Sequence, residues 1–212
     1  MDSTSSPVRR TGHRLPLATL LLVLAMWSVL VTAGFTTLFA HDATPGEIAE
    51  APGRWPAATS VRLDPSRPTL VLFAHPRCPC TRATIAELDR VMARCAGRLA
   101  ASVWFYTDPA LGPEWARTAS WNHAANIPGV RAEVDASGEA ARSFGAETSG
   151  SVVLYAPDGR LLFHGGITAS RGHEGDNAGA AAILALVAGE TAATRSTPVY
   201  GCALRAPLQE SR

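Results

Sequence analysis

The sequence predicts an α/β protein, a three-layer α/β/α sandwich with a mixed sheet, preceded by one transmembrane helix. Three observations support this class. Residues 15–40 contain no charged side chain, short apolar runs alternate with helical patterns between residues 69 and 190, and two late strand-like runs flank a tight-turn sequence. Parallel strands require crossover helices, whereas a terminal hairpin supplies an antiparallel edge.

The N-terminal region has the charge distribution of a membrane anchor. Residues 1–14 are polar and carry three arginines, and the uncharged run 15–40 exceeds the roughly 20 residues that cross a bilayer. Acidic residues follow this run, so the positive-inside rule places residues 1–14 in the cytoplasm and the later residues outside, facing the periplasm. The alternative is a cleaved signal peptide, but its apolar region normally has only about 7 to 15 residues. We therefore expect a single-pass protein retained in the inner (cell) membrane.

Composition divides the rest of the chain into three parts. Residues 41–59 are rich in proline and small polar residues, which predicts a linker without fixed structure of its own. Residues 60–190 carry the alternating strand and helix patterns of a folded domain. Residues 191–212 form a C-terminal tail, whose last ten residues we expect to be disordered.

The first half of the predicted domain contains two buried strands and a helix between them. Residues 70–74 form an apolar run bounded by Pro68 and Pro76, which is typical of a central strand. Residues 81–99 place their apolar side chains on one helical stripe. A second apolar run, 102–106, then ends at an Asp-Pro pair.

The second half of the predicted domain continues the alternation and ends in a hairpin and a helix. Prolines bound the first of its helices, an Ala-Pro-Asp-Gly sequence predicts the hairpin turn, and Asp176 or Asn177 is expected to cap the last helix. The expected elements are helix 114–126, strand 130–134, helix 139–144, strands 152–155 and 161–164, and helix 178–187.

Two cysteines, Cys78 and Cys80, stand where the first strand passes into the first helix of the domain. A helix N-terminus presents unpaired N–H groups and a positive dipole end, both of which favour a thiolate. Arg77 adds a positive charge next to the first thiol. Cys78 is therefore the candidate nucleophile, and Cys80 is its candidate partner.

A disulfide between these cysteines has one residue fewer in its ring than a Cys-x-x-Cys bond. Two extended residues span about 7 Å, and disulfides need Cα atoms about 4.4 to 6.8 Å apart, so the bond can form if Pro79 bends the chain. We expect a strained, easily reduced bond that suits exchange. The residues leave two other interpretations open, a metal clasp and a structural pair without chemistry.

Three further side chains, His75, His173 and Cys202, are candidates for a role at the thiols. His75 lies at the end of the strand, and His173 lies in a glycine-spaced polar loop; an imidazole at either place can move protons or bind a metal ion. Cys202 has three possible roles, to resolve a mixed disulfide with Cys78, to pair with Cys95 or to remain alone. Cys95 falls on the apolar stripe of its helix, so we expect it to be buried and inert.

The charge composition gives no indication of a nucleic-acid partner. The net charge is +1, and the 19 basic residues are all arginine. They do not cluster, and an arginine-rich nucleic-acid site would require clustering. Four cysteines in 212 residues also do not make a disulfide framework, so each must be judged by its neighbours.

In this order of elements, residues 60–190 resemble the thioredoxin fold, most specifically in the strand, Pro76-Arg77-Cys78-Pro79-Cys80 and helix passage. The later passage from residue 135 to 166 resembles membrane-anchored thioredoxin-like proteins of bacteria. Within that group, the chain is most similar to the RedB-type bacterial redoxins, through residues 75–80 and 170–177. The resemblance implies a thioredoxin-like sandwich and a redox-active disulfide between Cys78 and Cys80.

Two departures from the thioredoxin pattern concern the thiols. Thioredoxin-like proteins usually have two residues between the paired cysteines, and here only Pro79 separates them. They also place a cis-proline facing the thiols, whereas this chain has Thr-Ser-Gly-Ser at residues 148–151. In the family that the chain resembles, the cis-proline keeps backbone groups available to a peptide and keeps metal off the thiols. Without it, the resemblance predicts neither peptide binding nor metal exclusion for this chain.

These observations together predict a periplasmic thiol–disulfide oxidoreductase, anchored in the membrane through residues 15–40. Cys78 attacks or is attacked first, Cys80 resolves the intermediate, and the substrates are protein thiols or disulfides. Such exchange needs no dissociable cofactor and no metal. The first alternative is a Cu(I)-binding or copper-delivery protein that uses both thiols with His75 or His173. The second is a thiol peroxidase in which Cys78 becomes a sulfenic acid and Cys80 or Cys202 condenses with it.

Overall fold

The computed structural model describes residues 16–47 and 49–205, and the chain divides into two units, Met1–His41 and Asp42–Arg212. The predicted cytoplasmic residues 1–14 lie outside the described residues. Helix α1, Leu17–Ala43, has 27 residues, and within the described part of the chain it is the one helix long and apolar enough to cross a membrane. At 1.5 Å per residue it measures about 40 Å. Residues 17–40 of the expected apolar span are therefore helical.

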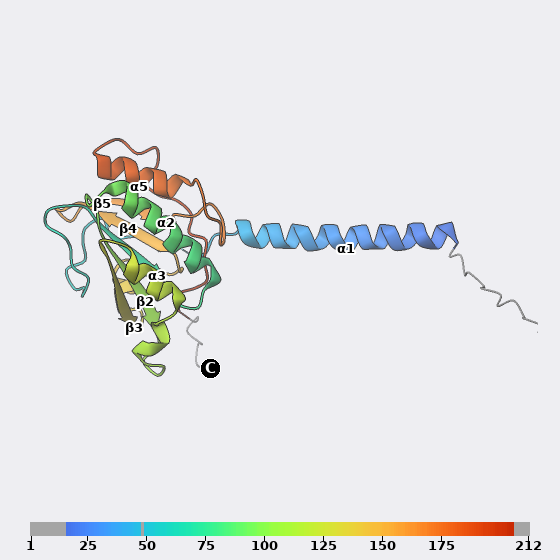
Figure 1. The fold of residues 1–212 in the computed structure, drawn as a ribbon, viewed down its shortest axis with the longest axis horizontal. Helices are drawn as coiled ribbons and strands as arrows, with labels where there is room; N and C mark the ends of the chain where they lie inside the picture. Colours follow the sequence, from blue (N-terminus) through green and yellow to red (C-terminus); the bar gives the residue numbers. More distant parts are fainter. Residues whose placement is uncertain (1–15, 48, 206–212) are drawn as a thin grey trace, which may run out of the picture. The chain divides into compact units, whose positions relative to one another are not determined.

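A mixed five-stranded sheet forms the centre of the second unit (Figure 1). Its spatial order is β3-β2-β1-β4-β5; β1, β2 and β3 are parallel, and β4 is antiparallel to both β1 and β5. All six residues of β1 are buried, because a central strand has neighbours on both faces. The strands are β1 (Thr69–Ala74), β2 (Ala100–Thr107), β3 (Val130–Ala136), β4 (Ser151–Tyr155) and β5 (Leu161–Gly165).

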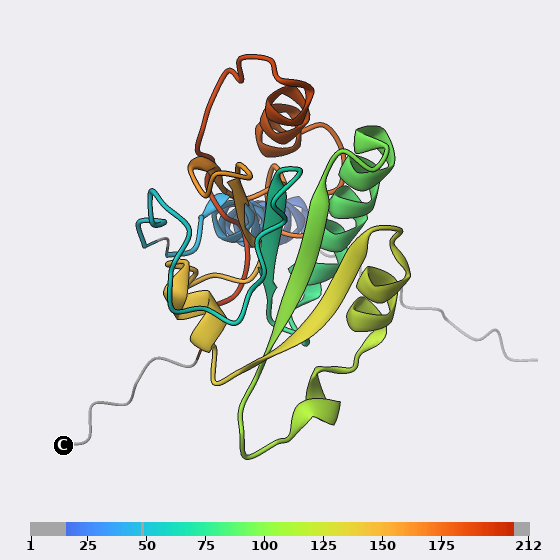
Figure 2. The same ribbon diagram turned by 90° about the vertical axis from the view of Figure 1, so that its left-hand side faces the viewer.

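Helices cover both faces of this sheet and complete the three layers (Figure 2). One apolar core joins the sheet to the helices of the first face, and a second core joins it to α4 and to residues around Ala51 and Val61. The first face carries α2 (Pro79–Cys95), α3 (Ala119–Asn126) and α5 (Ala178–Ala188); α4 is Glu139–Ser143. The order of elements and the mixed sheet make this a thioredoxin-like fold, as expected.

Two helices differ from their expected bounds. The helix expected at 114–126 is split, because a 3-10 turn at Pro113–Ala116 is followed by an extended Thr118 before α3 begins. Helix α2 ends at Cys95 rather than at residue 99. The reason is that Ala96 adopts a left-handed conformation with φ 47°, which closes the helix.

Residues 41–59 are not the unstructured linker that the composition predicts. The Gly46 N–H donates to Val199 O (2.8 Å), and the Tyr155 hydroxyl donates to Pro52 O (2.7 Å). The Trp55 ring packs edge-on against Tyr155, with ring centroids 5.1 Å apart. Backbone pairing and one aromatic side chain therefore hold the described residues of this segment against the sheet, and the folded unit extends beyond the predicted 60–190.

The C-terminal tail is also ordered where the structure describes it. Val199 and Leu204 are each 1% exposed, and the Leu204 N–H donates to Glu147 O (2.8 Å). The expectation of disorder is therefore wrong for residues 203–205, because Leu204 enters the second apolar core. Residues 206–212 lie outside the described residues.

Candidate functional site

The strand-to-helix transition from β1 to α2 carries the two paired thiols, as the sequence predicts. Cys78 is the N-cap residue of α2, Pro79 occupies the first helical position, and Cys80 follows in the first turn. Proline is well suited to this place because the first N–H groups of a helix have no partner within it. The Cys78 N–H donates to His75 O (3.1 Å), which closes the turn before the helix.

The Cys78 sulfur lies in an environment that stabilises its negative charge. The residue is 5% exposed, and its Sγ is 3.2 Å from the Sγ of Cys202. Burial opposes ionisation, but the N–H and S–H groups of Cys202 and the N–H groups of Cys80 and Thr81 outweigh it and lower the pKa of Cys78. The Cys80 and Thr81 N–H groups belong to the first turn of α2, whose positive dipole end also favours a thiolate.

The other two thiols at the site keep their protons instead. Burial and the nearby Cys78 raise the pKa of the Cys80 thiol. Burial, the hydrogen bond to Cys78 and the charge of Cys78 raise the pKa of Cys202 to about 11. Cys78 is therefore the thiol of the reduced site that ionises first, while Cys80 and Cys202 keep their protons to higher pH; such a difference suits thiol–disulfide exchange.

This distribution predicts the order in which the thiols titrate. In the reduced protein the first thiolate should form at Cys78, at a pH below the value of about 8.5 that is usual for cysteine, because a lowered pKa means ionisation at lower pH. Ultraviolet thiolate absorbance measures it. Cys202→Ala should move this midpoint upward, since it removes an S–H donor to the Cys78 sulfur. A first midpoint at or above the usual value would contradict the expectation.

Ser149 belongs to the segment 148–151, which was expected in place of the cis-proline of the thioredoxin pattern, and no cis peptide bond is present among the described residues. The Ser149 hydroxyl accepts from the His75 N–H (2.9 Å) and bonds the Thr81 hydroxyl (2.9 Å). The next residue, Gly150, donates its N–H to Phe73 O (2.8 Å). This serine therefore ties the end of β1 to the start of α2, and so fixes the turn that carries Cys78.

His75 does not contact either paired thiol. Its Nδ1 accepts from the Arg77 N–H (3.2 Å), and its ring lies between Tyr106 and Trp115, with centroids 6.0 and 5.4 Å away. Burial and the charge of Arg77 lower the pKa of His75, so the ring is neutral at neutral pH. The Arg77 guanidinium lies over Trp115 at 5.2 Å. The structure therefore gives no contact through which His75 acts on the sulfurs.

The loop after β5 reaches the thiols, but not through His173. The charge of Arg171 and the N–H of Gly172 favour the ionised form of Cys80, although burial outweighs them. His173 is exposed, and its N–H donates to Ser170 O (3.3 Å). The sequence correctly indicated this loop, whereas the residue that acts on the sulfur is an arginine.

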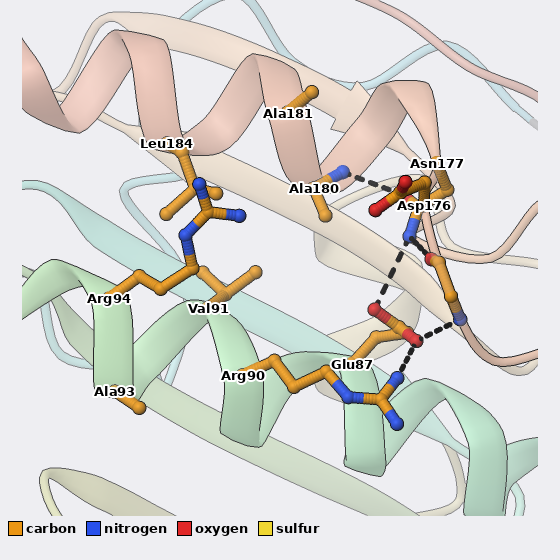
Figure 3. Close-up of a pocket in the computed structure, with 11 residues that line it drawn as sticks. Glu87, Arg90, Val91, Ala93, Arg94, Asp176, Asn177, Ala180, Ala181 and Leu184 are labelled. Atoms are coloured by element: carbon orange, nitrogen blue, oxygen red, sulfur yellow. Dashed lines mark hydrogen bonds and ion pairs between the residues drawn. The ribbon is translucent and has the colours of Figure 1, made fainter.

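Glu87 in α2 holds the same loop in place from below (Figure 3). Its carboxylate is buried, accepts from the Gly175 N–H (2.6 Å) and the Asn177 amide (3.5 Å), and pairs with Arg90. Asn177 in turn caps α5, since its Oδ1 accepts from the Ala180 N–H (2.7 Å). A cavity of about 570 Å³ lies between α2 and α5 beside these groups, and neither paired thiol lines it.

We expect Glu87→Ala to lower the free energy of unfolding by about 2 kcal/mol, because it leaves the Gly175 N–H without its buried acceptor. Urea denaturation followed by tryptophan fluorescence measures the change. The matched control is Glu174→Ala, which removes an exposed partner of Arg90 at 2.9 Å. An exposed ion pair contributes less than about 1 kcal/mol. Equal effects of the two substitutions would contradict the role given to Glu87.

The potential copper ligands do not form a complete group. Within residues 16–47 and 49–205, no three His, Cys, Asp or Glu side chains are grouped in a way that could hold a metal ion. His75 is engaged by Arg77 and two rings, and His173 is exposed. The histidine that the copper interpretation uses as a third ligand is therefore not beside Cys78 and Cys80.

The remaining cysteines differ from each other. Cys95 is 1% exposed in the first apolar core, and burial raises its pKa, as suits the inert thiol that was expected. Cys202 is exposed, and its nearest cysteine contact is with Cys78, at 3.2 Å between the two sulfurs, and not with Cys95. A shallow hollow of about 320 Å³, lined in part by Arg77, Cys78 and Arg82, opens on another side of the first thiol.

Comparisons with known proteins support the fold and give no activity. No protein-family model matches the chain, and no curated protein matches it. The chain is similar to the crystal structure of a hypothetical protein from Sinorhizobium meliloti 1021, with 27% identity and a TM-score of 0.56 over 76% of this chain and 93% of that one. It is also similar to an uncharacterized conserved protein from Geobacillus kaustophilus, with 18% identity and a TM-score of 0.55 over 79% and 94%.

A secreted Mycobacterium tuberculosis disulfide oxidoreductase, described as homologous to E. coli DsbE, also matches part of the chain. It aligns over 45% of this chain and 66% of that one, with 19% identity and a TM-score of 0.38. This overlap is too small to bear on activity.

Proposed function

We propose that this chain is a membrane-anchored thiol–disulfide oxidoreductase whose redox-active pair is Cys78 and Cys80. The observation that carries the proposal is the geometry of the site: Cys78 caps α2, Cys80 lies in the first turn of that helix, and the Cys202 Sγ is 3.2 Å from the Cys78 Sγ. This arrangement lowers the pKa of Cys78 and raises the pKa values of Cys80 and Cys202. The thiolate is the attacking species in exchange, and a low-pKa thiol is also the better leaving group. One sulfur is thus prepared to form and release disulfides.

The exchange can be written with the chain's own sulfurs. The Cys78 thiolate attacks one sulfur of a partner disulfide, a mixed disulfide forms, and the partner's other sulfur leaves as a thiolate. Cys80 then loses its proton and attacks Cys78, which releases the partner's second thiolate and leaves a Cys78–Cys80 disulfide. Two electrons pass to the partner, and the protons of Cys80 and the solvent neutralise its thiols. The reverse sequence oxidises a partner dithiol.

The side of the membrane on which the domain lies follows from helix α1 and the charges around it. The arginines of residues 1–14 precede the apolar helix, Asp42 lies in its last turn, and Glu47 follows it. The positive-inside rule then favours a cytoplasmic N-terminus and a domain that faces the periplasm, an oxidising compartment in which disulfide exchange is normal. The resemblance of residues 75–80 and 170–177 to the RedB-type redoxins supports this proposal.

Turnover of a polypeptide disulfide tests the proposed function. The full chain in detergent micelles is expected to accelerate the reduction of insulin by dithiothreitol, because each cycle forms one internal disulfide that dithiothreitol reduces again. The rate is measured from the precipitation of the free insulin B chain. A rate equal to that without the protein would overturn the proposal.

A further inference from the structure

The C-terminal segment, residues 195–205, places Cys202 next to the Cys78 sulfur. The Ser149 N–H donates to Cys202 O (2.8 Å), and Thr148 and Ala203 form an antiparallel bridge. This pairing leaves Cys202 exposed to solvent on one side and 3.2 Å from the Cys78 sulfur on the other. Cys78 itself is 5% exposed.

The segment is a fixed part of the domain. Val199 and Leu204, on either side of Cys202, are each 1% exposed, and Arg171 donates to Gly201 O. Gly201 lies so close to the sheet that a Cβ there would be 1.9 Å from Ser149 O. Cys202 is therefore held beside Cys78 by buried contacts on both sides, and it reaches that sulfur without any opening of the domain.

We propose that Cys202 is the sulfur through which polypeptide partners exchange disulfides with Cys78. The inference rests on the proposed function and changes one step of it: the partner forms its mixed disulfide with Cys202 instead of directly with Cys78. Cys78 is placed between two thiols, Cys80 on its own helix and Cys202 on the C-terminal segment. In this relay, Cys78 is bonded first to Cys80 and then to Cys202.

The first step is an internal exchange. In the form with a Cys78–Cys80 disulfide, the Cys202 thiolate attacks the Cys78 sulfur, the Cys78–Cys80 bond breaks, and a Cys78–Cys202 bond forms. Cys80 leaves as a thiolate and takes up one proton, which balances the proton lost by Cys202. No electron enters or leaves, so no outside oxidant is needed.

The second step is exchange with a partner dithiol. A partner thiolate attacks the exposed Cys202 sulfur and Cys78 leaves; the lowered pKa of Cys78 makes it a good leaving group. The second partner thiolate then attacks the partner sulfur bound to Cys202, so that the partner gains a disulfide. The chain keeps both electrons as reduced Cys78 and Cys202, which take up the two protons. A partner disulfide is reduced by the same steps in reverse.

Disulfide mapping of the full chain in detergent micelles tests this relay. The chain is oxidised with glutathione disulfide, quenched in acid, treated with N-ethylmaleimide, and digested for mass spectrometry. We expect the oxidised Cys80→Ser protein to contain a Cys78–Cys202 disulfide. When this protein receives one equivalent of reduced glutathione before the quench, glutathione should bond to Cys202, and Cys78 should carry the maleimide. Glutathione on Cys78 through the neighbouring hollow, or no Cys78–Cys202 bond at all, would overturn the relay.

Insulin turnover separates failure of the relay from failure of the proposed function. We expect Cys202→Ser to slow turnover by about tenfold or more, because the exposed exchange sulfur is lost. Cys95→Ala is the matched control and should turn over at the wild-type rate. If Cys202→Ser matches the wild type while Cys78→Ser is inactive, the relay is wrong and the oxidoreductase stands. If Cys78→Ser also matches the wild type, both proposals fail.

Discussion

Cys78→Ser is expected to slow dithiothreitol-dependent insulin reduction by about two orders of magnitude or more, to the rate without protein. Both disulfides that the chain forms between its own cysteines in the proposed cycle, Cys78–Cys80 and Cys78–Cys202, contain the Cys78 sulfur. A serine hydroxyl does not ionise near neutral pH and forms no disulfide, so no other side chain at the site can replace this role. The measurement is the initial rate in full-chain protein, with folding checked by circular dichroism.

Two further cysteine variants provide controls for this experiment. Cys95→Ala removes a thiol that is 1% exposed in the core, and its rate should equal that of the wild type. Cys80→Ser removes the resolving thiol and should lower turnover less than Cys78→Ser, because Cys202 still lies 3.2 Å from Cys78. A Cys78→Ser protein that keeps more than half of the activity would show that the chemistry lies elsewhere.

Gly201→Ala is expected to separate Cys202 from Cys78 without changing any thiol. The added Cβ would lie 1.9 Å from Ser149 O, a backbone atom that cannot rotate away. The C-terminal segment must therefore shift, and both the Ser149 N–H to Cys202 O bond and the Arg171 contact are strained. We expect a loss of about 2 kcal/mol of stability, which is typical of an overpacked contact.

The chemical consequence of Gly201→Ala is measured by disulfide mapping. The fraction of Cys78–Cys202 disulfide in oxidised Cys80→Ser protein should fall by about tenfold, which corresponds to about 1.4 kcal/mol. Gly53→Ala is the matched control, since the Cβ meets nothing within 4 Å there. An unchanged fraction of this disulfide would mean that the segment does not position Cys202.

The first half of the site could be predicted from sequence because it depends on local pattern. An apolar run, a proline-bounded thiol pair and an amphipathic helix together place Cys78 at a helix N-terminus, and the structure has it there. The hairpin of β4 and β5 and the Asn177 cap depend on equally local signals. These features need only neighbouring residues to form.

The segments that complete the site could not be predicted in this way. Residues 41–59 and 195–205 join the domain through backbone hydrogen bonds, which leave no periodic pattern in the sequence. Their anchors are single side chains, Trp55 against Tyr155 and Leu204 in the second core. Arg171 and Ser149 were missed for a related reason, because their partners lie far away along the chain.

Equilibration of the full chain in glutathione buffers of known potential tests the central claim most directly. After acid quenching and alkylation, mass spectrometry counts the disulfides that contain Cys78 at each potential. We expect Cys78 to pass reversibly from thiol to disulfide, with the loss of two electrons, at a midpoint between about −300 and −120 mV. A Cys78 that stays reduced, or stays bonded, throughout this range would contradict the account.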